Sequence, residues 1–203
     1  MKSDVITVTG SGEGLREALA QAEAVADFKK VSPKEKMHLR LLSEEMLGLL
    51  RALTGDYRAD YWIEDKDGVF ELHLRVETLV NTELRRKLMS VSSSGKNIAA
   101  KGVMGKIREV FACALEPASA NPYDVVSKGL ILLNDNMVDM NVNYVWSLNH
   151  YVDTIKSDDT ITPETWDELE KSIVAKLSDD VQISILENVV EMIILKSMKQ
   201  TDE

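Results

Sequence analysis

Two adjacent glutamates, Glu44 and Glu45, lie in the middle of LRLLSEEMLGLLRALTG, residues 39–55, a segment that is otherwise mostly apolar. A carboxylate in such a position can act as a general base or contact a bound ligand. It can also lie on the solvent flank of a helix and do no chemistry. Successive helical residues project about 100° apart, so the two glutamates cannot face the same environment. Both interpretations remain open for Glu44.

A second candidate is the segment SSSGKN, residues 92–97, which precedes an expected helix. Small hydroxyl side chains, a glycine and a lysine at a helix start bring together backbone N–H groups, the positive end of the helix dipole and a cation, which favours anion binding. The segment is not a P-loop, because Ser90 replaces the first glycine and Asn97 replaces the Ser or Thr after the lysine. A connecting loop with a Ser or Asn cap is the alternative. The candidate anion-binding residues are Ser92, Ser93, Ser94, Gly95, Lys96, Asn97 and Lys101.

Metal and nucleophile chemistry find little support in the sequence. The histidines His38, His73 and His150 are scattered, and none has a Cys, His or carboxylate partner at a spacing typical of metal ligands, so no metal site is expected. His73 alternates out of the apolar face of its strand and is expected to face solvent. The sequence has no G-x-S-x-G or Cys–His signature, and the single cysteine, Cys113, excludes a disulfide framework.

The composition indicates one domain with a substantial core, because 44% of the 203 residues are hydrophobic and 29% are charged. The net charge of −10 argues against a nucleic-acid-binding protein, which needs a basic face. No apolar run approaches the roughly 20 residues of a membrane span, and the start of the chain is too polar for a signal peptide. We therefore expect a cytoplasmic protein that binds neither nucleic acid nor membrane.

The elements that would position these candidate residues follow from hydrophobic periodicity and turn signals. Ser32, Pro33 and Glu35 form a capping signature at the start of the segment that contains Glu44. Residues 123–160 show spacing compatible with helix first and extended chain later. The pattern predicts an α+β fold, a two-layer sandwich with a mostly antiparallel sheet and helices on one face. The expected elements are a strand near 5–9, helices at 15–30 and 34–54, a hairpin at 57–77, helices at about 98–115 and 164–177, and a hairpin at 181–196.

Three segments together resemble a known family. LRLLSEEMLGLLRA, residues 39–52, resembles a helix of the GHKL ATPases, which share the histidine-kinase-like ATP-binding fold, and especially of their bacterial anti-sigma-factor branch. In that helix a glutamate precedes a Mg²⁺-binding asparagine by four residues; Glu44 matches the glutamate, and Gly48 stands at the position of the asparagine. The strand VFELHLRVET is similar to the one that leads into the adenine-binding box, and Glu77 approximates its aspartate. The run at 166–196 is similar to the last helix and hairpin of the family.

The resemblance implies one GHKL-like domain over 1–203, in which 81–162 form an enlarged helical insertion at the position of the nucleotide lid. It implies ATP with Mg²⁺ as the ligand, with Glu44, Gly48 and Glu77 at the nucleotide site and the anion-binding segment as the replacement phosphate site. A glycine side chain cannot hold Mg²⁺, however. Acidic side chains that replace the phosphate-side glycines would repel phosphate; they are Asp167, Glu168 and Glu170.

The function that fits these departures is that of a bacterial regulatory protein that acts by binding a partner protein, either with or without a bound nucleotide. An active ATPase or an anti-sigma-type serine kinase, with Glu44 as the general base, is the first alternative. A dimerisation module without a ligand, working as a homodimer, is the second.

Overall fold

The computed structural model describes residues 1–52, 57–77, 103–105, 107–108, 146–157, 171–186 and 189–198. The anion-binding segment and most of the expected insertion lie outside the described residues. In chain order the elements are β1 (Ile6–Thr9), α1 (Leu15–Phe28), α2 (Pro33–Ala52), β2 (Arg58–Lys66), β3 (Val69–Glu77), β4 (Trp146–Ser147), α6 (Leu148–Ser157), α8 (Ile173–Leu177), β5 (Asp180–Leu186) and β6 (Val189–Ser197).

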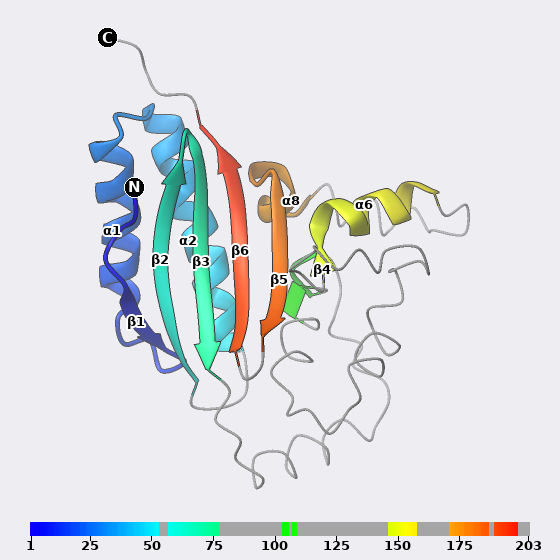
Figure 1. The fold of residues 1–203 in the computed structure, drawn as a ribbon, viewed down its shortest axis with the longest axis horizontal. Coiled ribbons are helices and arrows are strands. Elements are labelled where there is room, and N and C mark those ends of the chain that lie inside the picture. The colour runs from blue at the N-terminus through cyan, green and yellow to red at the C-terminus, as the bar shows by residue number, and fades with distance from the viewer. Residues whose placement is uncertain are drawn as a thin grey trace, which may run out of the picture.

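A six-stranded sheet forms the centre of the fold (Figure 1). Its strand order is β1-β2-β3-β6-β5-β4, and every neighbouring pair is antiparallel. The two predicted hairpins, β2–β3 and β5–β6, lie side by side because β3 pairs with β6 over the whole length of both strands, from Val69 opposite Ser197 to Glu77 opposite Val189. The prediction that both hairpins share one sheet is confirmed.

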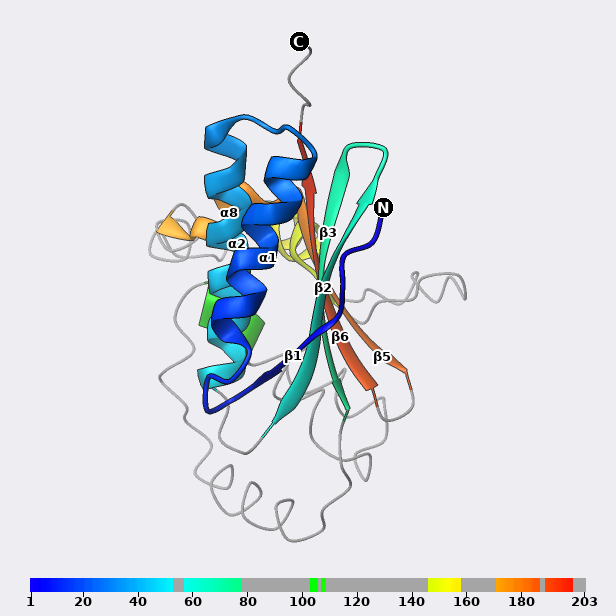
Figure 2. The same cartoon turned by 90° about the vertical axis from the view of Figure 1, so that its left-hand side faces the viewer.

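The helices α1, α2 and α8 lie on one side of this sheet (Figure 2). The described part of the chain is therefore the two-layer α+β sandwich that the sequence predicts. We call the side of the sheet that faces these helices the covered face and the opposite side the outer face. Strand residues alternate between the two faces, so each strand contributes to both.

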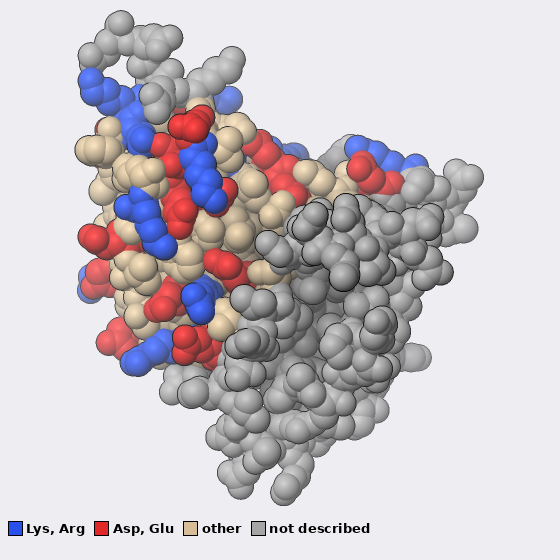
Figure 3. Space-filling model, in the orientation of Figure 1, with Lys and Arg blue, Asp and Glu red and all other residues tan. Residues whose placement is uncertain are grey.

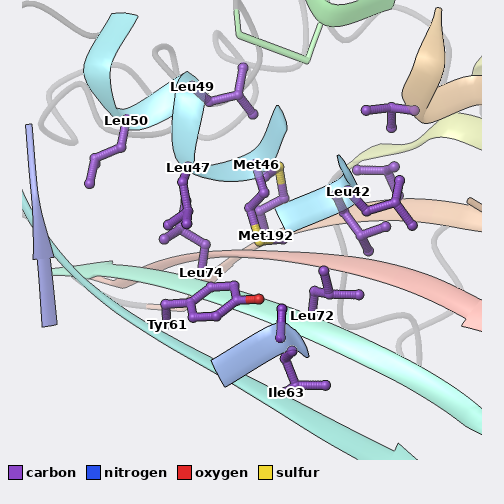
Figure 4. Close-up of a cluster of buried hydrophobic side chains, with 14 of the residues drawn as sticks. Leu42, Met46, Leu47, Leu49, Leu50, Tyr61, Ile63, Leu72, Leu74 and Met192 are labelled. Atoms are coloured by element: carbon purple, nitrogen blue, oxygen red, sulfur yellow. The ribbon is translucent and has the colours of Figure 1, made fainter. Parts of the chain in front are cut away.

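The core lies between the covered face and α2, and its composition follows from the two periodicities (Figure 4). Alternate residues of the strands meet the apolar stripe of α2. The stripe begins after the predicted capping box, in which the N–H of Glu35 donates to Ser32 Oγ at 3.3 Å and the N–H of Ser32 donates to the Glu35 carboxylate at 3.3 Å. The side chains of this core are almost fully buried; they include Leu39, Leu42, Met46, Leu49 and Leu50 of α2 and Tyr61, Ile63, Phe70, Leu72, Leu74, Met192 and Ile194 of the strands.

The region expected to be a helical insertion also contributes a strand to the sheet. Trp146 and Ser147 pair with Ile183 and Gln182 of β5 and form one edge of the sheet. Asp180 holds this edge together, because its carboxylate accepts a hydrogen bond from Ser147 Oγ at 3.1 Å. The helix α6 follows directly, whereas the spacing of residues 123–160 indicated extended chain in this later part.

The helix expected at 164–177 is not continuous. Its described end, α8, is a separate helix that begins after Ser172, whose backbone is extended with φ −70° and ψ 122°. Ser172 Oγ accepts a hydrogen bond from the N–H of Ala175 at 3.2 Å. A serine inside a helical pattern can cap a new helix in this way instead of continuing the old one. The expected cap at Thr162 lies outside the described residues.

Candidate functional site

Polar and aromatic side chains of three neighbouring strands gather on the outer face. Trp62 and Glu64 come from β2, Glu71 and His73 from β3, and Glu191 from β6. The register places Trp62 opposite His73 and Glu64 opposite Glu71, so the pairs lie next to each other on one side of the sheet. We call these five residues the outer-face cluster. Figure 3 shows the described part of this face, where acidic and basic side chains are interleaved.

His73 is the centre of the outer-face cluster. Its Nδ1 lies 3.0 Å from Glu191 Oε1, and its Nε2 lies 3.2 Å from Glu71 Oε2. The imidazole stacks on the Trp62 ring, with centroids 4.6 Å apart and planes 6° from parallel. The side chain is only 8% exposed. The expectation that His73 faces solvent is therefore wrong: it leaves the apolar face as predicted, but its neighbours on three strands bury it.

Two lysines approach the carboxylates of the cluster from the solvent side. Lys2 Nζ lies 3.3 Å from Glu64 Oε1 and 4.5 Å from the centroid of the Trp62 ring. Lys66 Nζ lies 2.8 Å from Glu71 Oε2. The hydrogen bond that Trp62 Nε1 donates to Glu64 at 2.9 Å lowers the pKa of Glu64 against the opposing effect of burial, with a further contribution from Lys2. Glu64 is thus held in its charged form.

The cluster also supplies atoms of the kind that bind metal ions. Glu64, Glu71 and His73 each offer one ligand atom, and these atoms lie within 4.8 Å of one another. The sequence shows no histidine with a partner at the spacing of a linear metal motif, but the structure places two carboxylates, Glu71 and Glu191, against His73. Glu71 is two residues away in the same strand, so the two side chains lie on the same side of the sheet, but this spacing belongs to no linear metal motif. Glu64 and Glu191 lie near His73 only because of the strand register, which cannot be read from the sequence.

Glu44, the candidate general base, is an exposed residue of α2. Gly48 is exposed on the same flank of this helix, and a Cβ atom built there would meet no other atom within 4 Å. Glu45 is half-buried. Glu77 is an exposed residue at the end of β3, in the other layer of the sandwich. The structure therefore puts Glu44 and Gly48 together, as helical spacing requires, and leaves Glu77 apart from them.

The remaining predicted site residues, Ser92 to Asn97 and Lys101, lie outside the described residues. The helical residues 103–105 and 107–108, green in the figures, follow them in the chain; they lie next to β4 and β5 in Figure 1 and on the side of α1 and α2 in Figure 2. Val103 and Ile107 are 3% and 1% exposed and belong to the core. Gly105 is buried too, so close packing accounts for a glycine inside this helix.

A shallow groove of about 540 Å³ runs between α1 and the first residues of the chain. Gln21 braces it, because its side-chain amide donates to Ser3 Oγ at 2.7 Å and to the Asp4 carbonyl at 2.8 Å. Met1 and Phe28 line the groove and are 47% and 73% exposed. The groove is mostly apolar and offers a surface for contact, with Asp4 as its titratable side chain.

Comparison of the chain with known protein families, with curated proteins and with solved structures finds no match. Among the helices that the structure describes, none combines the length and the apolar character needed to cross a membrane.

Proposed function

We propose that this chain is a cytoplasmic bacterial regulatory protein of the GHKL-like fold, which acts by binding a partner protein and does not hydrolyse ATP. The order of the elements supports the family assignment. A strand, two helices and a hairpin are followed, after a long intervening region, by a helix and a second hairpin, with the helices on one face of the sheet. The resemblance implies this same order.

The exposed position of Glu44 supports the proposal that the protein does not hydrolyse ATP. A general base must be held within hydrogen-bond reach of the proton it removes, and such a group is usually fixed by packing and by neighbouring hydrogen bonds. Glu44 instead lies on a solvent-exposed flank of α2. Gly48, one turn away, has no side chain with which to hold Mg²⁺. These two residues fit a helix surface better than a hydrolytic centre.

An assay of phosphate release from Mg-ATP tests this part directly. We expect the wild type and the Glu44→Gln variant to release phosphate at the same background rate. Glu45→Gln is the matched control, because it removes the neighbouring carboxylate from the same helix. A wild-type rate that falls roughly a hundredfold or more in Glu44→Gln alone, the loss typical of a general base, would replace this proposal by the ATPase alternative.

Thermal unfolding with and without Mg-ATP separates a nucleotide-binding regulator from a ligand-free one. Nucleotide at about 100 times its dissociation constant should add roughly 2.7 kcal/mol to the free energy of unfolding. A shift without hydrolysis assigns ATP as a regulatory ligand. No shift at millimolar nucleotide leaves the partner protein as the ligand. Light scattering at increasing protein concentration then distinguishes partner binding from the homodimerisation alternative.

A further inference from the structure

Both ring nitrogens of His73 lie within hydrogen-bond distance of carboxylates, and the ligand atom of a further carboxylate is close to the same place. Both of its ring nitrogens face carboxylate oxygens, Nδ1 toward Glu191 at 3.0 Å and Nε2 toward Glu71 at 3.2 Å. A neutral imidazole has a single N–H, so one nitrogen would turn its lone pair toward a negatively charged oxygen. A cation at that contact would accept this lone pair, and Glu64 brings a third ligand atom to the same place.

We propose that Glu64, Glu71 and His73 bind a divalent transition-metal ion, with Zn²⁺ as the preferred ion, on the outer face of the sheet. In this site Nε2 of His73 and one oxygen of each glutamate coordinate the ion. Glu191 accepts the hydrogen bond from Nδ1–H and so keeps the lone pair of Nε2 directed at the metal. A carboxylate on the distal nitrogen is the usual companion of a metal-bound histidine. The site is independent of the GHKL-like assignment.

The site is built on rigid parts of the fold. Glu64 and Glu71 are directly opposite each other in the β2–β3 hairpin, and β6 supplies Glu191 from the other side. The Trp62 ring fixes the plane of the imidazole by stacking at 4.6 Å. Ligand atoms of a tetrahedral zinc site lie roughly 3.3 Å apart, as bond lengths near 2.0 Å require. His73 and Glu71 already have this separation, and the Glu64 ligand atom lies within 4.8 Å of both.

The two lysines at the cluster do not prevent binding. Lys2 and Lys66 have side chains that are 53% and 59% exposed. Ion pairs whose lysines are this exposed are weak, so a metal ion can displace both lysines into water at small cost. Two carboxylates and one neutral imidazole then balance the charge of the divalent ion. One nitrogen and two oxygen ligands favour Zn²⁺ over Mg²⁺ or Ca²⁺, which prefer oxygen alone.

The ring contact between Trp62 and His73 provides a built-in reporter for the test. The full chain, freed of metal with a chelator, is titrated with Zn²⁺ by calorimetry at neutral pH and with Co²⁺ by absorption and tryptophan fluorescence. We expect one ion per chain and partial quenching of the tryptophan fluorescence by Co²⁺, because Trp62 is one of three tryptophans. Glu64→Gln should weaken binding by roughly tenfold or more, and Glu191→Gln by about 10–100-fold through the orientation of the imidazole. His38→Gln, which changes a histidine outside the cluster, is the matched control.

Folding of the variants is checked separately by circular dichroism without metal. Glu64 has a side chain that is 24% exposed, so Glu64→Gln is expected to keep the native fold even where a His73 variant does not. Nitrogen-resolved NMR of His73 gives a second readout, because Zn²⁺ should shift Nε2 and leave Nδ1 protonated. Absence of stoichiometric binding by the wild type would overturn the proposal. So would unchanged affinity in Glu64→Gln, or a His73 ring that responds to protons only.

Discussion

The two faces of one sheet are built on different principles, although the same strands supply both. On the covered face, Tyr61, Ile63, Leu72 and Leu74 are buried by a second layer, the helix α2. On the outer face, His73 is buried to a similar degree by side chains of the sheet itself. A helical layer removes large apolar areas from water, whereas cross-strand neighbours on the outer face cover one ring and must satisfy its polar atoms.

This difference has an energetic consequence. Burial of apolar surface is worth roughly 25 cal/mol per Å², so a complete aliphatic side chain contributes a few kcal/mol. The ion pairs of the outer face lie partly in water and contribute about 0–1 kcal/mol each. We therefore expect the covered face to set the stability of the fold and the outer face to be free for binding. The following predictions test this contrast.

The largest effect is expected from neighbouring residues of β3 that point to opposite faces. Leu74→Ala should lower the free energy of unfolding by about 2–5 kcal/mol, because it leaves a cavity under α2. Arg75→Ala, the matched control one residue further along, should change it by less than about 0.5 kcal/mol, because Arg75 is exposed. Urea unfolding followed by circular dichroism measures both. Equal losses would remove the distinction between the faces.

A charged group at the end of the covered face should give the second effect. Burial raises the pKa of Asp65, but the hydrogen bonds from Lys29 and from the N–H of Gly68 at 2.9 Å outweigh it and hold the pKa below its usual value. A depressed native pKa contributes stability above the unfolded value of about 3.9 and loses it as the pH falls through the native value. Asp65→Asn should therefore cost about 1.5–3 kcal/mol at neutral pH and flatten the loss of stability below about pH 4.

Asp67→Asn, in the turn of the same hairpin, is the control for Asp65. Asp67 is exposed and has a positive φ of 54°, a conformation that asparagine also accepts. Its substitution should leave both the stability and the acid profile unchanged. If the two variants behave alike, the pairing of Asp65 with Lys29 does not contribute to the fold. Unfolding in denaturant between acidic and neutral pH provides the comparison.

The hydroxyl of Tyr61 should give the third effect. Ser43 Oγ donates its single proton to the Leu39 carbonyl at 2.7 Å, so the Tyr61 hydroxyl must be the donor in its 2.7 Å contact with Ser43. Tyr61→Phe removes this hydrogen bond inside the core and should cost about 0.5–1.5 kcal/mol. A double variant with Ser43→Ala should lose less than the sum of the single losses, because both remove the same bond.

The same tyrosine makes the covered face sensitive to alkali. Burial raises the pKa of Tyr61 well above its usual value. A raised native pKa contributes stability that is complete below the unfolded value of about 10 and is lost as the pH rises beyond it. Wild-type stability should fall above about pH 10, and Tyr61→Phe should remove that part of the fall. An identical alkaline profile in both proteins would contradict the assignment.

How far the sequence predicts this structure also differs between the two faces. Strict alternation in β3 and the apolar stripe of α2 predict the residues of the covered face directly, because burial against a second layer requires apolar residues at a regular spacing. The capping box at Ser32 and Glu35 is likewise a local pattern and is confirmed. Ser172 shows the limit of such patterns. The apolar spacing of a helix continues through this serine, but in the structure it caps a new helix. Local spacing does not reveal which hydrogen bond such a side chain prefers.

The outer-face cluster could not be found by spacing alone. Its carboxylates come from three strands, and Glu191 is 118 positions from His73 in the chain. Only the register of β3 with β2 and β6 brings them together, and a shift of one residue would turn each of these side chains to the other face. One signal was present: Glu71 and His73 are two residues apart in a strand, which predicts that they share a face. The role of Glu44 and of the anion-binding segment stays a prediction.

The smallest effect is expected from the ion pair of Lys66 and Glu71. Its atoms are 2.8 Å apart, but the lysine side chain is 59% exposed, so water and salt screen the attraction. A double-mutant cycle with Lys66→Ala and Glu71→Gln, measured by urea unfolding in the presence of a chelator, should give a coupling energy of about 0.2–1 kcal/mol. The coupling should vanish in about 1 M salt, where the Debye length is near 3 Å. A coupling above about 2 kcal/mol that survives such salt would show that the outer face stores stability as the covered face does. It would also mean that Lys66 is too firmly held to yield Glu71 to a metal ion.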